Sequence, residues 1–295
     1  MTVAAETAHV AAPERPNLDP TAVMQRAGSE NFPVALAVLP KVLRTRLLAI
    51  YGYARMIDEI GDRQVPLEPG ERLAQLDWAE QELDRALLGQ AEHPVFVAVG
   101  DVARQLGIDR VPFVGLIEAN RLDQRVSRYA DYAALEGYCA LSANPVGRLV
   151  LDIFGASTPA TVELSDRVCT ALQLVEHFQD VVEDHLAGRI YLPQDDLARF
   201  GVTEGDLLGP VSPGLRRLMA FECGRARALL VSGAPLPVLI GGFGRLAISG
   251  FIGGGLAQLD ALEAAGYDVF GAPVKASKPA VTRAMLRLVV SGRAR

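Results

Sequence analysis

Helical periodicity runs through almost the whole of this chain. Apolar residues recur at i, i+3 and i+4, the repeat that gathers them on one face of an α-helix, and alternating strand patterns closed by hairpin turns are absent. Clusters of Pro and Gly separate the helical segments, as at 66–70. We therefore predict helices at about 40–60, 71–88, 94–106, 111–128, 131–154, 159–187, 213–232 and 238–265.

The composition favours one large domain over two small ones. Half of the 295 residues are hydrophobic, which is enough for an extensive core, and no linker divides the helical segments. We predict a single all-α domain over residues 23–290 around a central cavity. Residues 1–22, rich in Ala, Pro, Glu and Thr and without a signal-peptide pattern, are predicted to be a disordered tail.

Charge and cysteine content narrow the partners and the compartment. The net charge is −6 and no basic stripe with interleaved aromatics appears, so a nucleic-acid partner is not expected. Cys139, Cys169 and Cys223 are widely spaced in apolar helical patterns, which indicates buried, reduced thiols in a cytoplasmic protein. The sequence leaves the oligomeric state open.

The segment 238–256 is apolar and long enough to resemble a membrane span. Arg245 lies near its middle and glycines recur through it, and both features favour a buried helix beside a cavity. Peripheral contact with a membrane remains open.

Two acidic motifs follow strongly apolar helical segments. Asp58 and Asp62 form the first pair, and Asp180 and Asp184 form the second. Residues four apart share one face of a helix, and a single such pair is usually a solvated face. Two pairs at the ends of buried helices instead predict a shared site for Mg²⁺, which binds a few carboxylates together with substrate phosphates.

With these motifs in view, the sequence resembles the head-to-head isoprenoid synthases, the squalene/phytoene synthase family. The resemblance covers about residues 28–278. Segments 29–35 and 142–148 are most similar to the bacterial hydroxysqualene synthase branch, which belongs to hopanoid biosynthesis. The residues that carry the family resemblance are Ser29-Glu30-Asn31-Phe32-Pro33, the run 50–59, Tyr138-Cys139 with Gly147, the run 188–193, and Gly266-Tyr267-Asp268-Val269-Phe270.

The resemblance implies the all-α isoprenoid synthase fold and a Mg²⁺-dependent reaction. In the branch it favours, presqualene diphosphate becomes hydroxysqualene with loss of diphosphate. The alternative is head-to-head condensation of two farnesyl or geranylgeranyl diphosphates, which gives presqualene diphosphate, squalene or phytoene. Substrate chain length, and whether water or a reductant quenches the cation, stay open.

Metal and diphosphate roles are assigned by the same resemblance. Asp58, Asp62, Asp180 and Asp184 would hold the Mg²⁺ ions that assist departure of the diphosphate. Arg55 lies one turn before Asp58, and we expect it to contact diphosphate rather than merely pair with that aspartate.

Substrate contacts are expected from three further groups of residues. Ser29 and Asn31 would donate to phosphate, although both are also common helix caps. Phe32, Tyr51 and Tyr138 would line the carbocation pocket, and simple core aromatics are the alternative. Gln173 is expected to be a polar residue of the pocket. Arg189 and Tyr191 are expected to close over the diphosphate.

The chain departs from the family pattern in the acidic motifs. Glu59 follows Asp58 where relatives commonly carry a second Asp, and Glu176 replaces a common Asn. Glu176 is expected to be a fifth metal ligand or to hold the water that captures the cation. Asn144 is expected to position that water. Lys275 and Lys278 are expected to be solvated rather than to hold phosphate.

Rival classes have weaker support. Residues 242–247 match the dinucleotide fingerprint G-x-G-x-x-A, which would suggest an NADPH-dependent reductase, but no strand–helix alternation surrounds them. A di-iron bundle would need Glu-x-x-His pairs, and none of the four histidines has a Glu three residues before it. We expect His177 and His185 at the surface or behind the ligands. A purely structural helical protein would leave the acidic helix ends unexplained.

Overall fold

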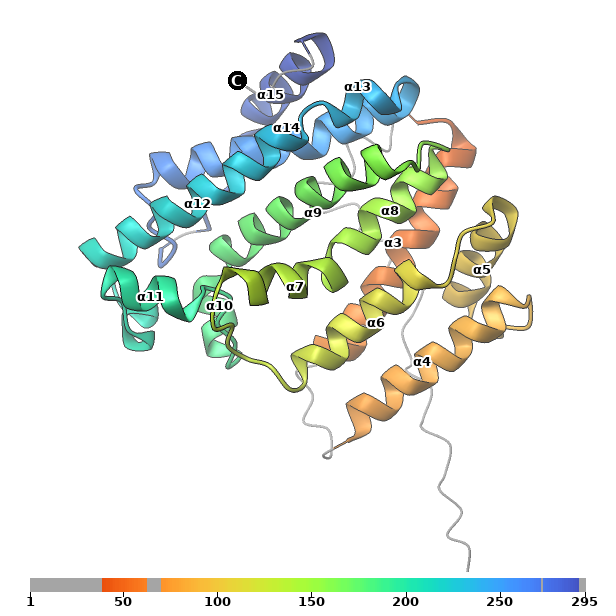
Figure 1. Cartoon of the computed structure of the whole chain (residues 1–295), viewed down its shortest axis with the longest axis horizontal. Coiled ribbons are helices and arrows are strands. Elements are labelled where there is room, and N and C mark those ends of the chain that lie inside the picture. Colours follow the sequence, from red (N-terminus) through yellow and green to blue (C-terminus); the bar gives the residue numbers. More distant parts are fainter. Residues whose placement is uncertain (1–38, 63–69, 272, 292–295) are drawn as a thin grey trace, which may run out of the picture.

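Helices dominate the chain, as the periodicity predicts. The computed structural model describes residues 39–62, 70–271 and 273–291, and every structural statement below refers to them. No strand occurs in these ranges, where Arg128 and Ile190 form an isolated bridge. The elements (Figure 1) are α3 (Lys41–Asp62), α4 (Glu71–Leu87), α5 (Pro94–Leu106), α6 (Val111–Asp123), α7 (Tyr132–Ser142), α8 (Asn144–Ile153), α9 (Pro159–Gln179), α10 (Val181–Leu186), α11 (Gln194–Phe200), the 3₁₀ turn η1 (Glu204–Leu208), α12 (Pro213–Gly233), α13 (Leu236–Ile240), α14 (Gly242–Ala264) and α15 (Lys278–Ser291).

Three predicted helices are each divided in the structure. The segment 238–265 breaks at Gly241, between α13 and α14. The segment 131–154 breaks at Ala143, and Pro145 occupies the first turn of α8, where its missing N–H does no harm. The segment 159–187 breaks at Asp180. Our prediction also lacked the short helix α11 and the amphipathic helix α15.

Helix ends follow local sequence signals. Thr158 caps α9 with a reciprocal capping box to Thr161, and Pro159 follows in the first turn. Gly107 ends α5 with φ of 67°, a left-handed conformation that glycine adopts without strain. These signals explain why the predicted limits of α5 agree with the structure.

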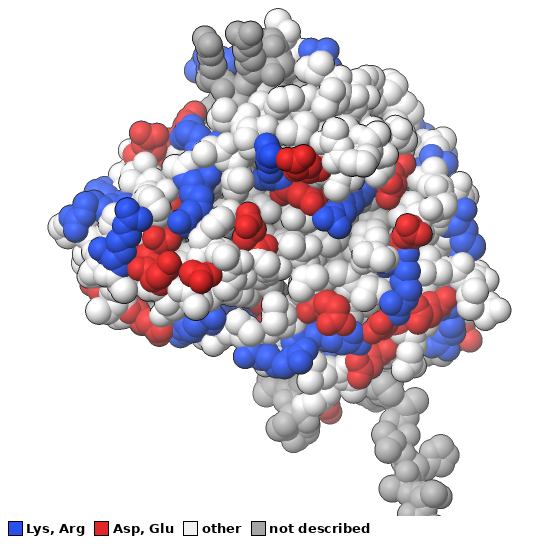
Figure 2. All heavy atoms as spheres, in the orientation of Figure 1, with Lys and Arg blue, Asp and Glu red and all other residues white. Residues whose placement is uncertain are grey.

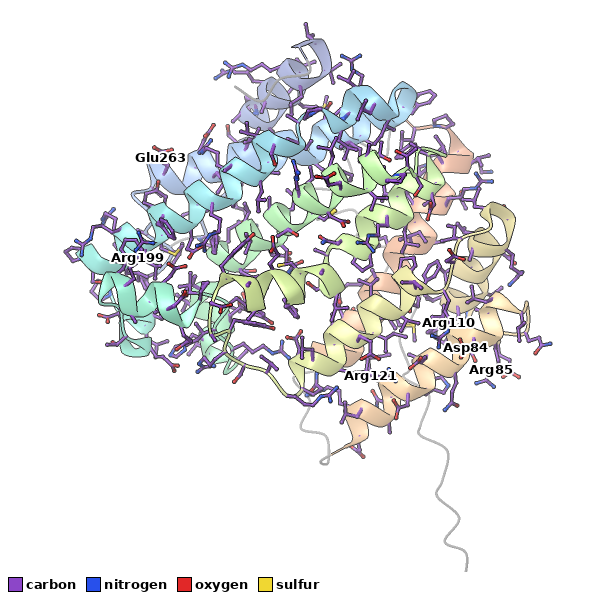
Figure 3. All side chains as sticks on the ribbon, viewed as in Figure 1. Asp84, Arg85, Arg110, Arg121, Arg199 and Glu263 are labelled. Carbon is purple, nitrogen blue, oxygen red and sulfur yellow. The ribbon has the colours of Figure 1, made fainter. Side chains whose placement is uncertain are left out.

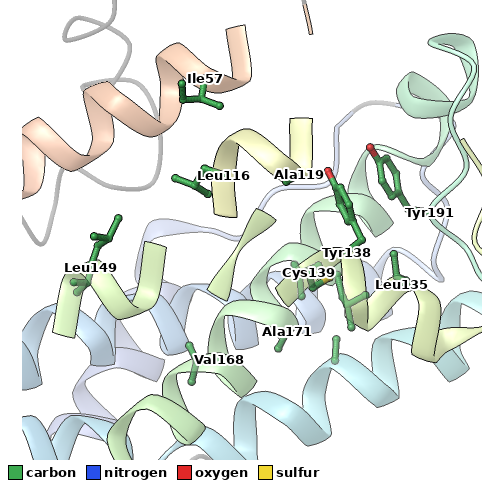
Figure 4. Packing of buried hydrophobic residues seen from close by; sticks show 14 of the residues in the cluster. Ile57, Leu116, Ala119, Leu135, Tyr138, Cys139, Leu149, Val168, Ala171 and Tyr191 are labelled. Carbon is green, nitrogen blue, oxygen red and sulfur yellow. The ribbon is translucent and has the colours of Figure 1, made fainter. Parts of the chain in front are cut away.

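Helix α9 is central to the bundle. It packs against α8, α12 and α14, while α4 and α5 lie at one end of the molecule and α15 packs on the outer side of α14 (Figure 1). The buried apolar side chains form one cluster, and its part around Leu135, Cys139 and Ala171 is shown in Figure 4. The buried apolar side chains of the described residues therefore form one core.

Aromatic and ionic contacts fix α3, α4, α5 and α6 together. The Tyr53 ring meets Phe96 and Phe113 edge-on at centroid distances of 5.6 and 5.5 Å. Arg110 lies 2.6 Å from Asp84, and Arg121 lies among carboxylates of α4 (Figure 3). These partly exposed ion pairs align α6 with α4, and each stabilises the fold by about 1 kcal/mol or less.

The glycines of α14 allow close helix contacts. A Cβ at Gly253 would lie 2.7 Å from the backbone nitrogen of Met285, so α15 could not approach α14 if that residue were larger. Arg245 donates to the carbonyl of Val289.

The prediction that 238–256 contains a buried helix is confirmed for α14, which has many buried residues. A different stretch, 213–240, is apolar and long enough to cross a membrane by length and composition, and 39% of its most apolar window is buried.

Candidate active site

The first acidic motif lies at the end of α3, where α6 holds it. Asn120 Nδ2 donates to Asp58 Oδ1 at 3.3 Å and to the carbonyl of Leu116 at 3.1 Å. Gly61 lies directly against Asn120, since an added Cβ would come within 1.7 Å of the Asn120 amide oxygen. Asp62 ends the helix, and its side chain lies outside the described residues. The position of Asp58 thus depends on the last turns of α6.

Arg55 lies one turn before this aspartate but pairs with Glu59. Its Nε is 3.4 Å from Glu59 Oε1, and the two side chains are 33% and 17% exposed. The alternative in which Arg55 pairs with Asp58 is therefore not the arrangement seen. The remaining guanidinium donors are the groups that a phosphate ligand would use.

The second acidic motif spans a break between two helices. Asp180 ends α9 with φ of −101° and ψ of 16°, and α10 begins at Val181. The Asp184 backbone N–H still donates to the Asp180 carbonyl at 2.7 Å, so the two aspartates remain one turn apart. Burial, followed by the negative charges of Glu176, Asp184 and Glu183, raises the pKa of Asp180 to about 6. This half-buried position therefore carries excess negative charge.

His177 joins the second motif to the segment that follows α10. Its buried ring stacks on Tyr191 with centroids 3.7 Å apart and planes 11° apart. His177 Nδ1 is 3.7 Å from Asp184 Oδ2, and Gln173 Nε2 is 3.3 Å from His177 Nε2. His177 thus lies behind the acidic motif, one of the two positions expected for it, and Gln173 is a partly buried polar neighbour.

Tyr138 and Tyr191 share one carboxylate. Asp123 accepts a hydrogen bond from Tyr138 at 2.8 Å and from Tyr191 at 3.2 Å. Burial raises the pKa of both phenols, which therefore remain protonated donors. Their rings lie side by side with centroids 5.4 Å apart (Figure 4), and Tyr129 packs on both. Tyr191 is thus fixed by hydrogen bonding and stacking.

The backbone around Tyr191 is also anchored. Ile190 N–H donates to the Ser127 carbonyl at 2.9 Å, and Gln194 N–H donates to the Tyr129 carbonyl at 2.9 Å. The segment that we expected to close over a diphosphate is therefore held along the loop between α6 and α7. Arg189, next to it, is half-buried.

Helix α6 connects the two acidic motifs. Asn120 and Asp123 are one turn apart on α6; the first bonds Asp58 and the second bonds the tyrosines that lead to His177. This connection was not predicted from the sequence. The sequence feature that could have indicated it is a group of polar residues at the end of an otherwise apolar helix, namely Asn120, Asp123 and Gln124.

The other predicted site residues have varied surroundings. Asn144 is buried, and its Oδ1 accepts from Thr170 Oγ1 at 3.0 Å, which ties α8 to α9. Tyr51 is half-buried on α3, whereas Glu176 is exposed one turn before Asp180. Three predicted residues lie outside the described residues: Ser29, Asn31 and Phe32.

The donor chemistry of the second motif fits a divalent cation. Within the described ranges no three or more His, Cys, Asp or Glu side chains gather as a ready metal cage. Mg²⁺ does not need one, because it usually binds one or two carboxylates and completes its shell with waters and phosphate oxygens. Burial and repulsion from neighbouring carboxylates raise the pKa of Asp180, and a cation there would offset the repulsion.

The helical bundle and the acidic ends of two of its helices define the class of the protein, an all-α isoprenoid synthase fold. Residues 25–281 match the family model for squalene/phytoene synthase, and the chain belongs to that family.

Relatives with several activities resemble the chain to similar degrees. It is 36% identical to hydroxysqualene synthase of Rhodopseudomonas palustris over 210 residues, which cover 70% of each chain. It is 35% identical to phytoene synthase of Mycobacterium tuberculosis over 182 residues, which cover 62% of this chain and 59% of that protein. Presqualene diphosphate synthase of R. palustris is 32% identical over 189 residues, 64% of this chain and 67% of that protein.

Solved structures share the fold along most of its length. The squalene synthase HpnC of Alicyclobacillus acidocaldarius has a TM-score of 0.76 and 38% identity, covering 84% of this chain and 95% of its own. A dehydrosqualene synthase has a TM-score of 0.80 at 23% identity and supports the fold alone.

Proposed function

We propose that this protein converts presqualene diphosphate into hydroxysqualene and releases diphosphate in a Mg²⁺-dependent reaction. The observation that carries the proposal is the crowding of carboxylates around the half-buried Asp180. Burial, together with these negative charges, raises the pKa of its side chain to about 6. A site with this excess of negative charge attracts divalent cations, and such cations stabilise a departing diphosphate. Similarity to hydroxysqualene synthases supports the substrate.

In this proposal the four aspartates hold the ions. Asp58 and Asp62 bind from α3, while Asp180 and Asp184 bind from the α9–α10 junction. Bound Mg²⁺ supplies Lewis-acid stabilisation of the leaving diphosphate. Arg55, which pairs with Glu59, directs its free donors to phosphate oxygens.

Aromatic residues then stabilise the cation that departure leaves behind. The Tyr138 and Tyr191 hydroxyls are both engaged by Asp123, which fixes the orientation of the two rings. A ring face held in place can stabilise positive charge without reorganising. Tyr51 and Gln173 are proposed to complete the pocket, with Arg189 near the diphosphate.

Water capture needs a proton acceptor. When water adds to the carbocation, a carbon–oxygen bond forms and one proton leaves the water oxygen. Glu176, exposed one turn before Asp180, is the proposed acceptor. The oxygen of Asn144 is occupied by Thr170, so the amide Nδ2 is the group that would orient the water.

A second candidate function has support of its own. Similarity to phytoene and presqualene diphosphate synthases favours head-to-head condensation of two prenyl diphosphates. A reductase has no comparable support, because residues 242–247 lie at the start of α14, directly after α13, and no strand precedes them within the described ranges. The free cysteines fit the cytoplasmic location that we propose.

Incubation of the purified chain with single substrates tests the proposal. Presqualene diphosphate, farnesyl diphosphate and geranylgeranyl diphosphate are each supplied with Mg²⁺ and without NADPH, and the lipid products are identified by mass spectrometry. We expect hydroxysqualene from presqualene diphosphate. A product formed from farnesyl or geranylgeranyl diphosphate alone would favour the condensing reaction. No conversion in these reactions, with conversion restored when NADPH is added, would overturn the water-capture step.

A further inference from the structure

Helix α15 presents an outer face that combines apolar and basic side chains. Leu286 is 51% exposed and Val290 is 82% exposed, and one helical turn separates them. The opposite face is buried, since Leu288 is 1% exposed and Met285 lies against Gly253 of α14. A shallow groove of about 820 Å³ follows the outer face, and its lining includes Lys278, Thr282, Arg283, Leu286, Arg287 and Val290.

The apolar surface extends beyond α15 onto α13 and the start of α14. Val238, Leu239 and Phe243 are each about half exposed, at 48%, 56% and 49%. Arg245 donates to the Val289 carbonyl, which places the start of α14 beside the end of α15. In Figure 2 the described surface at the upper right of the molecule, where α13 lies in Figure 1, is mostly uncharged, and Lys or Arg side chains show at the top edge.

The charge of this region is opposite to that of the whole chain. Residues 275–295 contain six Lys or Arg and no Asp or Glu, whereas the net charge of the chain is −6. Within the described residues no carboxylate forms an ion pair with Lys278 or Arg283. The region that includes α15 is therefore a positive segment on an acidic protein, and it attracts anionic surfaces.

We propose that this face docks on the surface of an anionic phospholipid bilayer. Leu286 and Val290 would enter the headgroup boundary, while Lys278, Arg283 and Arg287 would lie at the lipid phosphates. A second copy of the chain is a poorer occupant, because two such faces would bring like charges together. The inference rests on the surface alone. A thirty-carbon product, which rests on the proposed function, would add a reason for bilayer contact.

Vesicle cosedimentation of the full chain tests the inference. One set of vesicles contains phosphatidylcholine alone and the other adds phosphatidylglycerol, each at low and high salt. We expect binding to require the anionic lipid and to weaken with salt. The variant Lys278→Glu/Arg283→Glu should bind at least about 25-fold more weakly, given that each basic residue near a membrane contributes roughly fivefold to affinity. Leu286→Asp/Val290→Asp should also lose binding, by at least about tenfold.

Matched control variants carry the same kinds of substitution at exposed positions outside α15. Arg125→Glu/Arg217→Glu reverses two other exposed charges, and Leu88→Asp/Val111→Asp replaces two apolar side chains that are each 71% exposed. Circular dichroism and thermal melting verify that every variant is folded. Equal binding to neutral vesicles, or equal loss in the control variants, would overturn the inference. A fall in molar mass of Leu286→Asp/Val290→Asp in light scattering, without vesicle binding by the parent chain, would assign the face to self-association instead.

Conversion of presqualene diphosphate in detergent solution separates this inference from the proposed function. If the α15 variants retain turnover but lose vesicle binding, the membrane face is supported independently of the catalytic assignment. If the parent chain binds anionic vesicles but converts no prenyl diphosphate, the proposed function fails and the membrane face stands.

Discussion

The imidazole of His177 lies flat on the ring of Tyr191, with centroids 3.7 Å apart. This stack joins the end of α9 to the segment after α10, on either side of the break at Asp180. Along the chain, Asp184 of α10 lies between the two stacked residues, and its Oδ2 is 3.7 Å from His177 Nδ1. The geometry of the second acidic motif is therefore fixed by packing behind it.

Loss of Asp123 should disorder both tyrosines. Asp123→Ala removes the acceptor of Tyr138 and Tyr191, and two buried hydroxyls without a partner cost about 1–3 kcal/mol each. We expect a lower melting temperature and turnover reduced by about tenfold or more. Asp109→Ala, an exposed aspartate before α6, is the control. Equal behaviour of the two variants would show that Asp123 has no positioning role.

A methyl group at Gly61 should displace Asn120 from Asp58. The added Cβ would come within 1.7 Å of the Asn120 amide oxygen, so we expect Gly61→Ala to lose about 1–3 kcal/mol of stability and most activity. Gly52→Ala on the same helix is the matched control, since no atom lies within 4 Å of its added Cβ. That change should be neutral or slightly stabilising. Denaturant unfolding and turnover measure both, and indistinguishable variants would contradict the close contact.

Mg²⁺ should stabilise the folded chain through the second motif. Neutralising the charge that crowds Asp180 favours the folded state, so the melting temperature should rise when Mg²⁺ and inorganic pyrophosphate are added. Asp180→Asn should melt higher than the parent chain without Mg²⁺ and should gain little when Mg²⁺ is added. Asp195→Asn, an exposed aspartate, should keep the full gain. A gain retained in Asp180→Asn would place cation binding elsewhere.

Stability should depend on pH through Glu222. This side chain is fully buried, donors of Arg225 lie 2.6 and 2.8 Å from its oxygens, and burial with the neighbouring Asp196 raises its pKa to about 8. Between about pH 4.5 and 8 the folded chain then binds more protons than the unfolded chain. Stability should fall as pH rises through this window and level off above it.

The variant Glu222→Gln isolates that contribution. Its free energy of unfolding should lack the decline, so the difference from the parent chain should change by a few kcal/mol, on the order expected for such a shift, between pH 5 and pH 8.5. Urea unfolding across the range measures it. A constant difference would mean that Glu222 titrates at its ordinary value.

Product ratios should show which residue orients the attacking water and which accepts its proton. Glu176→Ala should lower the share of alcohol among the products, because the proton acceptor is removed. Asn144→Ala should do the same if its Nδ2 orients the water, and it also breaks the bond to Thr170. Asn144→Asp keeps that oxygen and separates the two effects. An unchanged product spectrum at full rate in Glu176→Ala would remove Glu176 from the mechanism.

Local sequence was sufficient for most helices. Pro94 and Gly107 limit α5, and Thr158 with Pro159 begins α9, because capping and backbone conformation depend on a few neighbouring residues. The acidic motifs were visible for the same reason, as four-residue spacing on a helix is a local property. The helix α15 was missed, although its exposed face carries the alternation of basic and apolar residues that suits a surface.

Long-range packing determines which residues contact and position the acidic motifs. Asn120 meets Asp58 across 62 positions of sequence, and Tyr191 meets Asp123 across 68. No local pattern identifies such partners, since each contact depends on where α6 crosses α3 and where the chain returns after α10. The sequence by itself determined an all-helical chain with two acidic helix ends. Only the tertiary structure decided that α6 would join them, that α9 would break at Asp180 and that His177 would be buried against Tyr191, because these outcomes depend on how whole helices share one core.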